Sequence, residues 1–582
     1  MPDESKNRSR GTALVFGDDT RSFLTICRSL SRAGLDVHAA PFNFRAPALT
    51  SRFIKKVHFV PYYFGEGREW KDALHRIVQE EKIDILIPCD ERALIPLKDV
   101  QDELREETVV AVPTDEQYSV FFDKWKTREL AMNAGIPVAS AMYLSGEKSS
   151  AEIASALGLP VAVKPTSSFE KDSLYQRRAV KLVQSEEQLT EVLGSLGNGA
   201  YFCESFFPGI GEGVSVLASK GRVLQYFQHA RVHEPPKGGG SSYRISAPLH
   251  DGYKAACDKC IEYTAYTGLA MFEFRRNLST DEWILLEVNA RPWGSLPLPV
   301  SLGVDFPAWW CDLLRNDIAV THKDYRLGHY GRNLLQDINF LRTRGENDFS
   351  SKWHKAGAYL RSAASFGRIL IGKESLDSFV VDDPSPGFVE VWQLFRDKFS
   401  YLLRSTYLYR WYKKKATFQY LDQLLASPDT SVTVMVLCEG NICRSPFAAE
   451  LLGKTLRNAD RIVEVISRGT LPVQNRPADG TAHDAAMQMG IDLTEHRSAV
   501  IDMESLKRVD LILYFDERNL VSFRKRFPKA NVTLVPCGIF NPRGKGWEIR
   551  DPYGRGLQTF LKTFREIEVS INSLASRANP KA

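Results

Sequence analysis

Two cysteines, an asparagine, an arginine and a serine lie close together in residues 438–445, Cys-Glu-Gly-Asn-Ile-Cys-Arg-Ser. The segment follows an apolar strand pattern at 432–437 and opens a predicted helix at Pro446, a residue type favoured in a first helical turn. Backbone N–H groups in such a turn, backed by a helix N-terminus, form a cradle for an anion. Arg444 can grip two phosphate oxygens, and the same donors should lower the pKa of the Cys438 thiol. The residue types therefore predict attack of a thiolate on phosphorus.

The leaving oxygen of such a reaction needs a proton, which a carboxylic acid can supply. The candidate is Asp551, in the segment Ile-Arg-Asp-Pro-Tyr-Gly-Arg-Gly at 549–556. Proline stiffens this loop, and Tyr553 can wall a pocket for a flat substrate.

Residues 432–575 resemble low-molecular-weight protein tyrosine phosphatases, on the loop CEGNICRSP and the acid loop DPYG. The resemblance implies a reaction through a cysteinyl phosphate. The roles it implies are the nucleophile Cys438, the phosphate ligand Arg444, the general acid and base Asp551, the loop brace Asn441 and the thiolate donor Ser445.

Three further residues belong to this resemblance. Cys443 lies where the family often has a second cysteine, and it can protect Cys438 as a disulfide under oxidation. Arg468, in Ser-Arg-Gly-Thr, replaces the small residue usual in the family and can restrict the mouth of the site. His496 is expected to brace the fold and not to react.

A second group of residues suits a hard divalent cation. Glu273, Glu287 and Asn289 fall on a predicted hairpin, MFEFRRNLSTDEWILLEVNARPWG at 271–294. Two carboxylates and an amide oxygen on neighbouring strands suit Mg²⁺, with nucleotide phosphates as its other ligands. Arg291 follows and can hold a transferred phosphate.

Earlier residues can complete a nucleotide site. Lys124 and Lys164 supply positive charge, and the segment Cys-Glu-Ser-Phe-Phe-Pro-Gly, with Glu204 and Phe206, offers an apolar wall and free backbone groups for an adenine edge. Glu212 follows on a predicted loop and can accept from ribose hydroxyls.

In this order, these pieces of residues 12–310 resemble the ATP-grasp superfamily, and the carboxylate–amine ligases related to carbamoyl-phosphate synthase and biotin carboxylase in particular. The resemblance implies ATP clamped between two α+β subdomains and Mg²⁺, or Mn²⁺, on the Glu/Glu/Asn set. It also implies phosphorylation of a small-molecule carboxylate, followed by attack of an amine.

The chain departs from that pattern at the phosphate flap. TSSFEKD, after Lys164, has no glycine, and a Gly-rich loop comes only at 236–242, PKGGGSS. That loop can act as a lid, and Arg231, which precedes it, can bind the substrate. Trp293 fits substrate packing and core packing equally.

The elements that must position these residues predict an α/β multidomain protein. The chain has 582 residues, which is too many for a single hydrophobic core. Strands alternate with helices before about 114 and again after 431, which predicts parallel sheets. We expect a polar tail (1–10), a pre-ATP-grasp α/β domain (11–114), an α+β ATP-grasp domain (115–310), a helical connector (311–430) and a phosphatase domain with a four-stranded parallel sheet (431–582).

Bulk properties exclude several classes. A net charge of +5 gives no basis for nucleic-acid binding, and we see neither a signal peptide nor an apolar run that could span a membrane, so we expect the cytoplasm. Cys257 and Cys260 lack the further ligands of a zinc site. The basic, aromatic stretch 391–415 is interpreted as a helical strut and not as a membrane anchor.

Three functions remain open. The first is a bifunctional enzyme, an ATP-dependent ligase fused to a phosphatase that acts on a phosphorylated small molecule or on phosphotyrosine. The second is a regulatory protein tyrosine phosphatase with an ATP-sensing domain that ligates nothing. The third is a redox enzyme like the arsenate reductases, which the cysteine count disfavours because only Cys537 follows Cys443. A homodimer stays open.

Overall fold

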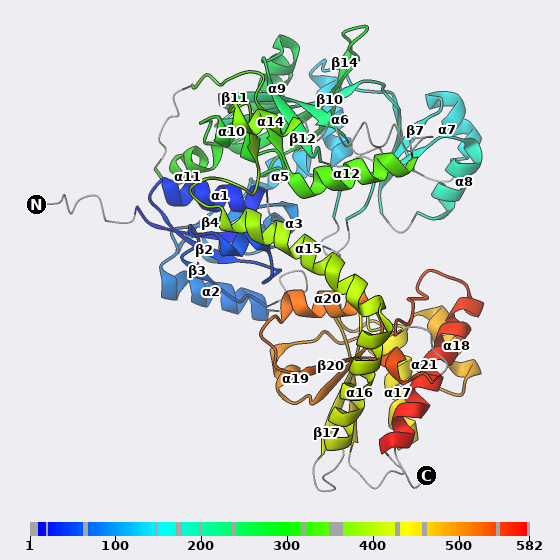
Figure 1. Ribbon diagram of the computed structural model, residues 1–582. Helices are drawn as coiled ribbons and strands as arrows, with labels where there is room; N and C mark the ends of the chain where they lie inside the picture. Colours follow the sequence, from blue (N-terminus) through cyan, green and yellow to red (C-terminus); the bar gives the residue numbers. More distant parts are fainter. Residues whose placement is uncertain are drawn as a thin grey trace, which may run out of the picture. The chain divides into compact units, whose positions relative to one another are not determined.

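The computed structural model describes residues 10–18, 21–61, 68–145, 148–169, 174, 177–196, 199–234, 240–316, 322–347, 365–424, 431–456, 463–542 and 547–578. The chain divides into two compact units (Figure 1). The first contains Met1–Phe42 and Ala46–Trp392, and the second contains Asn43–Arg45 and Gln393–Ala582. Among the helices of these ranges, none is both long and apolar enough to cross a bilayer.

The first unit starts with a five-stranded parallel sheet in the order β3-β2-β1-β4-β5. Its strands are β1 Thr12–Phe16, β2 Asp36–Ala40, β3 Lys56–Val57, β4 Ile85–Pro88 and β5 Val109–Val110. Its helices are α1 Ser22–Arg32, α2 Glu69–Glu81, α3 Glu91–Asp99 and α4 Gln101–Leu104. The strands are apolar on both faces, and α1 packs on one face while α2 and α3 pack on the other. This confirms the predicted α/β domain.

Two sheets follow in the same unit, antiparallel except where β15 Tyr330–Arg332 and β16 Glu374–Leu376 pair in parallel at the edge of the larger one. The smaller, in the order β6-β9-β7-β8, consists of β6 Ala141–Tyr143, β7 Val161–Pro165, β8 Lys181–Val183 and β9 Tyr201–Ser205, with α7 Ser150–Leu157 and α8 Glu186–Gly194. The larger is built on β10 Ile210–Ser219, β11 Arg222–His233, β12 Tyr243–Ala247, β13 Gly268–Arg276 and β14 Trp283–Asn289. The helices that pack on the larger sheet include α5 Asp115–Phe121, α6 Lys124–Asn133, α9 Asp251–Tyr263, α10 Pro297–Ser301 and α11 Phe306–Asn316.

Residues 311–430 differ from the predicted helical connector. They contain β15 Tyr330–Arg332 and β16 Glu374–Leu376, which extend the larger sheet to seven strands in the order β14-β13-β10-β11-β12-β15-β16. Strands of three residues are too short to show the alternation by which a strand is read from sequence. The helices of this stretch are α12 Leu334–Asn347, α14 Gly367–Leu370, α15 Ser385–Ser405 and α16 Tyr407–Leu424.

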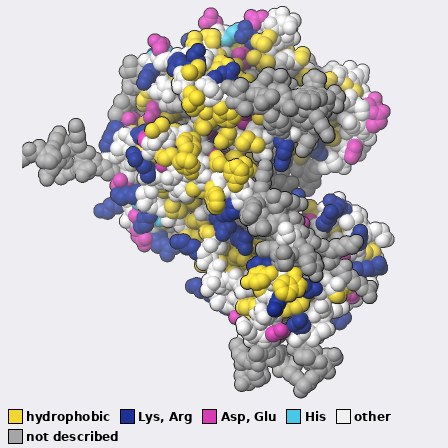
Figure 2. All heavy atoms as spheres, viewed as in Figure 1, with side chains coloured by type: hydrophobic (Ala, Val, Ile, Leu, Met, Phe, Trp, Pro, Cys, Tyr) yellow, Lys and Arg dark blue, Asp and Glu magenta, His cyan; other side chains and the backbone are white. Residues whose placement is uncertain are grey.

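The stretch also exposes apolar side chains. Val381 is almost fully exposed, and Leu370, Phe388 and Trp392 are exposed as well. Figure 2 shows apolar side chains on the face of the first unit that carries the start of α15. The strut interpretation of 391–415 stays a prediction.

Residues 374–383 form a clasp that ties the end of the first unit to earlier elements. The buried Arg28 of α1 pairs with Asp383 at 2.9 Å and donates to three carbonyls of the clasp. Arg244 of β12 pairs with Asp377, and Arg332 of β15 pairs with Glu374 at 2.6 Å. Both arginines have no exposed surface, so these carboxylates balance charge that is buried.

The second unit has a four-stranded parallel sheet in the order β18-β17-β19-β20, as predicted. Its strands are β17 Val432–Cys438, β18 Val463–Gly469, β19 Leu511–Tyr514 and β20 Thr533–Pro536. Its helices are α17 Arg444–Leu456, α18 Gly480–Gln488, α19 Met503–Lys507, α20 Glu517–Arg526 and α21 Leu557–Ala578. Helices α17, α18 and α21 pack on one face of the sheet and α20 packs on the other. Helix α17 begins at Arg444, two residues before the predicted start.

Candidate functional sites

The loop between β17 and α17 is held by Asn441. Its φ of 53° lies in the left-handed region, which asparagine tolerates better than most residues. Its side-chain Nδ2 donates to Ser445 Oγ at 2.8 Å and to Ser467 Oγ at 3.0 Å. Its Oδ1 accepts from the backbone N–H of Ala499 at 2.8 Å, so three bonds tie this loop to neighbouring segments.

The Cys438 sulfur lies at the floor of this loop and is almost fully buried. It accepts from the backbone N–H of Asn441 at 3.2 Å and lies 3.0 Å from Ser445 Oγ. Because Asn441 already donates to that hydroxyl oxygen, the hydroxyl proton of Ser445 is free to point at the sulfur. Two donors thus converge on the sulfur.

Arg444 joins the loop to the predicted acid. Its buried guanidinium contacts Asp516 Oδ2 at 2.6 Å and Asp551 Oδ2 at 3.2 Å. Burial opposes its charge, but Cys438, Asp551 and Asp516 outweigh this and raise the pKa of Arg444. The structure therefore brings the loop and the acid segment, far apart in sequence, to one cationic centre.

The remaining residues of this site surround the centre. Burial, and then the neighbouring Cys438, raises the pKa of the Cys443 thiol far above its ordinary value. His496 Nε2 lies 2.7 Å from the carbonyl of Asn441, and burial lowers the pKa of His496 in spite of that bond. Tyr553 is 60% exposed at the rim, while Arg468 donates to the carbonyl of Ser467. His496 is thus positioned against the loop backbone.

The second site lies on the hairpin of β13 and β14. Glu273 and Glu287 are directly opposite each other, and Asn289 Nδ2 lies 3.2 Å from Glu273 Oε1 and 3.4 Å from Glu287 Oε1. Asn289 Oδ1 accepts from Arg291 at 2.8 Å. The predicted metal ligand was the amide oxygen, so a half-turn of this amide would be needed to present it.

Cations offset the two carboxylates. Lys124 Nζ lies 3.0 Å from Glu287 Oε2, and Arg231 lies 2.6 Å from Glu273 Oε2. Burial opposes ionisation of Glu287, but Lys124 and more distant cations keep its pKa below the ordinary range. Burial raises the pKa of Glu273. The negative charge of Glu287 raises it further, and the positive charge of Arg231 only partly opposes this rise. The pair is therefore a place where negative charge is crowded and a cation is favoured.

The nucleotide candidates are partly brought together. Lys164 Nζ contacts Glu204 Oε1 at 2.5 Å, and its charge acts on Glu287. Phe206 is 41% exposed and its ring lies under the guanidinium of Arg275.

Glu212 is placed differently from the prediction. It lies within β10 and not on a loop, and its buried carboxylate accepts from Tyr253 Oη at 2.6 Å. Its neighbour Gly213 is the residue opposite Glu273, so the carboxylates of Glu212 and Glu273 point to opposite faces of the sheet. The structure does not bring Glu212 to the hairpin site.

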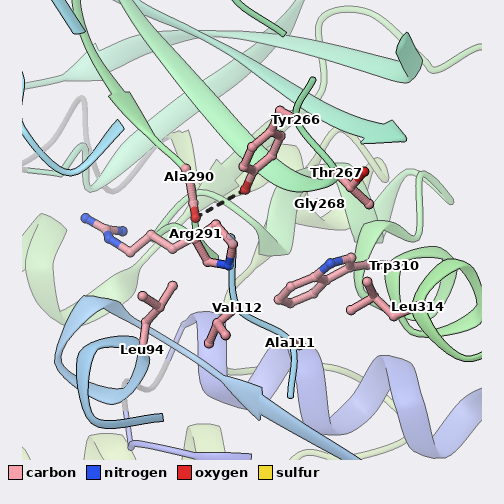
Figure 3. A pocket seen from close by; sticks show the side chains of 11 residues that line it. Leu94, Ala111, Val112, Tyr266, Thr267, Gly268, Ala290, Arg291, Trp310 and Leu314 are labelled. Atoms are coloured by element: carbon pink, nitrogen blue, oxygen red, sulfur yellow. Dashed lines mark hydrogen bonds between the residues drawn. The ribbon is translucent and has the colours of Figure 1, made fainter. Parts of the chain in front are cut away.

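Arg291 borders a cavity too small for a substrate. The cavity measures about 10 Å³, room for about one water molecule, and Tyr266, Ala290 and Trp310 line it. In Figure 3 the Arg291 guanidinium extends away from the Trp310 indole. The guanidinium lies 3.4 Å from Glu91. Trp293 is 1% exposed and packs against the core, as the core-packing alternative requires.

Sequence reasoning missed Asp516 and Glu91, the carboxylates beside Arg444 and Arg291. Both follow the carboxyl ends of parallel strands, β19 and β4. Such ends are where polar side chains converge in α/β sheets, and that signal could have found them. The predicted lid, the Gly-rich segment 236–242, falls largely on residues 235–239, which lie outside the described residues.

Solved structures resemble the first unit only with low TM-scores. The biotin carboxylase domain of the 2-oxoglutarate carboxylase from Hydrogenobacter thermophilus, solved with MgADP and bicarbonate, gives a TM-score of 0.44 at 16% identity, over 55% of this chain and 73% of that one. An L-amino acid ligase from Bacillus licheniformis gives 0.42 at 16% identity, over 56% and 79%.

The second unit has closer relatives. The probable low molecular weight protein-tyrosine-phosphatase EpsP from Ralstonia nicotianae is 32% identical over 145 residues, 25% of this chain and 94% of that protein. The low molecular weight phosphotyrosine protein phosphatase 1 from Drosophila melanogaster is 34% identical over 142 residues, 24% and 90%. Residues 433–581 match the family of low molecular weight phosphotyrosine protein phosphatases. Through its second unit, this chain therefore belongs to the low molecular weight phosphotyrosine protein phosphatase family.

Proposed function

We propose that this chain has two activities. The second unit removes phosphate from a phosphorylated aromatic group, and the first unit uses ATP to join a carboxylate to an amine. The observation that carries the phosphatase activity is the meeting of Cys438, Arg444 and Asp551 in one site. The observation that supports the ligase activity is the opposed Glu273–Glu287 pair with Lys124 beside it.

In the phosphatase reaction, the Cys438 thiolate attacks phosphorus and forms a sulfur–phosphorus bond while the bond to the leaving oxygen breaks. Protonated Asp551 gives its proton to that oxygen. Water then attacks the cysteinyl phosphate, Asp551 takes a proton from it, and inorganic phosphate leaves with the thiolate restored. Arg444 and the loop N–H groups hold the phosphate oxygens in both steps.

The depth of the nucleophile supports an aromatic substrate. The Cys438 side chain is almost fully buried, whereas Tyr553 is exposed at the rim beside Asp551. A phosphate on a phenyl ring can reach the floor of such a site while the ring packs on Tyr553. A phosphate on a short aliphatic side chain would leave the rim uncovered. We therefore favour phosphotyrosine, or a small molecule with an aryl phosphate, as the substrate.

In the first unit, the hairpin residues fit a magnesium ion. Glu273, Glu287 and the amide oxygen of Asn289 are hard oxygen donors, and the crowded charge of the two carboxylates is what a bound cation would relieve. When bound, Mg²⁺ would neutralise charge on the phosphates of ATP. Lys124 and Lys164, which now contact Glu287 and Glu204, can turn to those phosphates.

The ligase reaction proceeds by two displacements. A carboxylate oxygen of the acid attacks the γ-phosphorus of ATP. The bond from that phosphorus to ADP breaks, which forms an acyl phosphate and releases ADP. An amine then attacks the acyl carbon, so that the amide forms, inorganic phosphate departs and the nitrogen loses a proton. The amine and the acid are small molecules, and mass spectrometry of the amide product would identify them.

Three proteins test the proposal: the wild type, Cys438→Ser and Glu287→Gln, each incubated with Mg-ATP and a small-molecule extract. Mass spectrometry should find an amide that is absent with Glu287→Gln. If that amide carries a phosphate only with Cys438→Ser, the two units act on one pathway. Phosphotyrosine peptides should lose phosphate with the wild type and Glu287→Gln, but not with Cys438→Ser.

The outcomes separate the alternatives. If no product depends on Glu287 while peptide dephosphorylation depends on Cys438, the ligase proposal fails and a regulatory phosphatase with a nucleotide-sensing unit is left. If Cys438→Ser still removes phosphate from the peptides, the phosphatase mechanism fails.

A further inference from the structure

Two histidines and a glutamate meet at the edge of the five-stranded sheet, outside both sites described above. His38 lies in β2, His58 directly follows β3, and Glu81 is the last residue of α2. His38 Nδ1 lies 3.0 Å from His58 Nε2 and 3.9 Å from Glu81 Oε2. One potential ligand atom from each side chain lies within 4.8 Å of the other two.

These spacings suit a tetrahedral metal ion. Bonds of about 2.0–2.1 Å at tetrahedral angles hold ligand atoms about 3.3–3.4 Å apart, and the observed 3.0 and 3.9 Å lie on either side. Both imidazoles are buried, and an unprotonated imidazole nitrogen is the group that ligates a metal.

The charges around the cluster show what now compensates Glu81. Lys56 forms an ion pair with the Glu81 carboxylate. Lys55 pairs with Asp36 close by. The Lys56 side chain is 53% exposed, so its ammonium can move into water when another cation takes its place.

We propose that His38, His58 and Glu81 form a binding site for Zn²⁺ or a similar transition-metal ion, with water as the fourth ligand. The ion would replace the proton shared by the two rings and the ammonium of Lys56. It would join β2, the end of β3 and the end of α2, and so fasten the sheet edge. Two imidazoles favour Zn²⁺ over Mg²⁺, whereas the all-oxygen set on the hairpin favours Mg²⁺, so the two sites would select different ions.

The test uses Co²⁺ as the probe, with the full-length chain carrying Cys438→Ser so that its thiolate cannot bind metal. Excess Mg²⁺ occupies oxygen sites. One equivalent of Co²⁺ should give the visible absorption of a tetrahedral ion, which Zn²⁺ then removes. His38→Ala and Glu81→Gln should each weaken binding by about 100-fold or more. Lys56→Gln should tighten it by up to about fivefold, because it removes a competing exposed ion pair. His322→Ala, at an exposed histidine, is the control.

The proposal is overturned if the chain with intact His38, His58 and Glu81 gives no tetrahedral Co²⁺ spectrum, or if the spectrum survives in both His38→Ala and Glu81→Gln. If the proposal is overturned, the two rings share only a hydrogen bond. The intact chain and Lys56→Gln answer the question even if His38→Ala does not fold. Neither result bears on the ATP-dependent or phosphatase reaction, since no residue of those sites is changed other than Cys438.

Discussion

Replacing Asn441 separates the contributions that hold the phosphate loop. Asn441→Ala removes the donors to Ser445 and Ser467 and leaves the N–H of Ala499 without its acceptor. The net loss from hydrogen bonds and the unsatisfied donor is about 2–3 kcal/mol. Forcing an alanine to keep the φ of 53° adds about 1 kcal/mol. We expect the free energy of unfolding of the second unit to fall by about 3–4 kcal/mol.

Asn441→Gly is the matched variant. It loses the same hydrogen bonds, but glycine adopts a positive φ without strain, so it should be about 1 kcal/mol more stable than the alanine variant. This order is the reverse of that in a helix interior, where glycine is the worse residue by about 1 kcal/mol.

The assay is urea unfolding followed by hydrogen-exchange mass spectrometry on peptides from residues 463–542, which report on the second unit alone. The reasoning is refuted if alanine costs less than about 1 kcal/mol, since the hydrogen bonds alone exceed that. It is also refuted if alanine is as stable as glycine, because the left-handed backbone would then carry no strain.

Three other changes test other parts of the structure. Arg444→Lys keeps a charge but loses the planar fork, and kcat for an aryl phosphate should fall about 100- to 1000-fold in steady-state assays; a loss under about tenfold would contradict the role. Iodoacetamide at neutral pH should alkylate Cys438 and spare Cys443, whose pKa burial raises, and peptide mass spectrometry that finds both labelled would disagree. Burial, followed by the charges of Arg231 and Arg244, lowers the pKa of His229 to about 3. As the pH falls below the ordinary pKa of histidine, His229 is therefore protonated in the unfolded chain before it is protonated in the folded one. The stability present above the ordinary histidine pKa of about 6.5 should drop by about 1.6 kcal/mol between pH 6.5 and 5.0. His229→Gln should lose this dependence in urea titrations, and an unchanged slope would refute it.

The grouping of several residues at both candidate sites could be predicted because it rests on short segments. A strand followed by Cys438, a tight turn and Arg444 specifies its own geometry, and the hairpin of Glu273 and Glu287 needs only two adjacent strands. The partners of these residues were missed. The position of Asp516 and Glu91 after the carboxyl ends of strands marks them as candidates, but their pairing with Arg444 and Arg291 depends on the order of strands in a sheet, which no local pattern encodes.

Local patterns failed where tertiary contacts decide the structure. The strands β15 and β16 form because β12 offers an edge and because Arg332 and Arg244 need carboxylates. Glu212 sits between glycines, which predicted a loop, yet the pairing of β10 with two neighbours makes that segment a central strand. In each case a long-range contact outweighs the local preference.

The clasp at residues 374–383 limits how such a two-part protein can be assembled from separate genes. A polypeptide that stopped at the end of the predicted ATP-grasp domain, residue 310, would leave Arg28 and Arg244 buried without Asp383 and Asp377. An unpaired buried charge costs about 3–5 kcal/mol, a large part of the stability of a domain. A gene fusion could therefore join a phosphatase to this first unit only beyond the clasp. Loss or exchange of the second unit would therefore require a junction beyond Asp383.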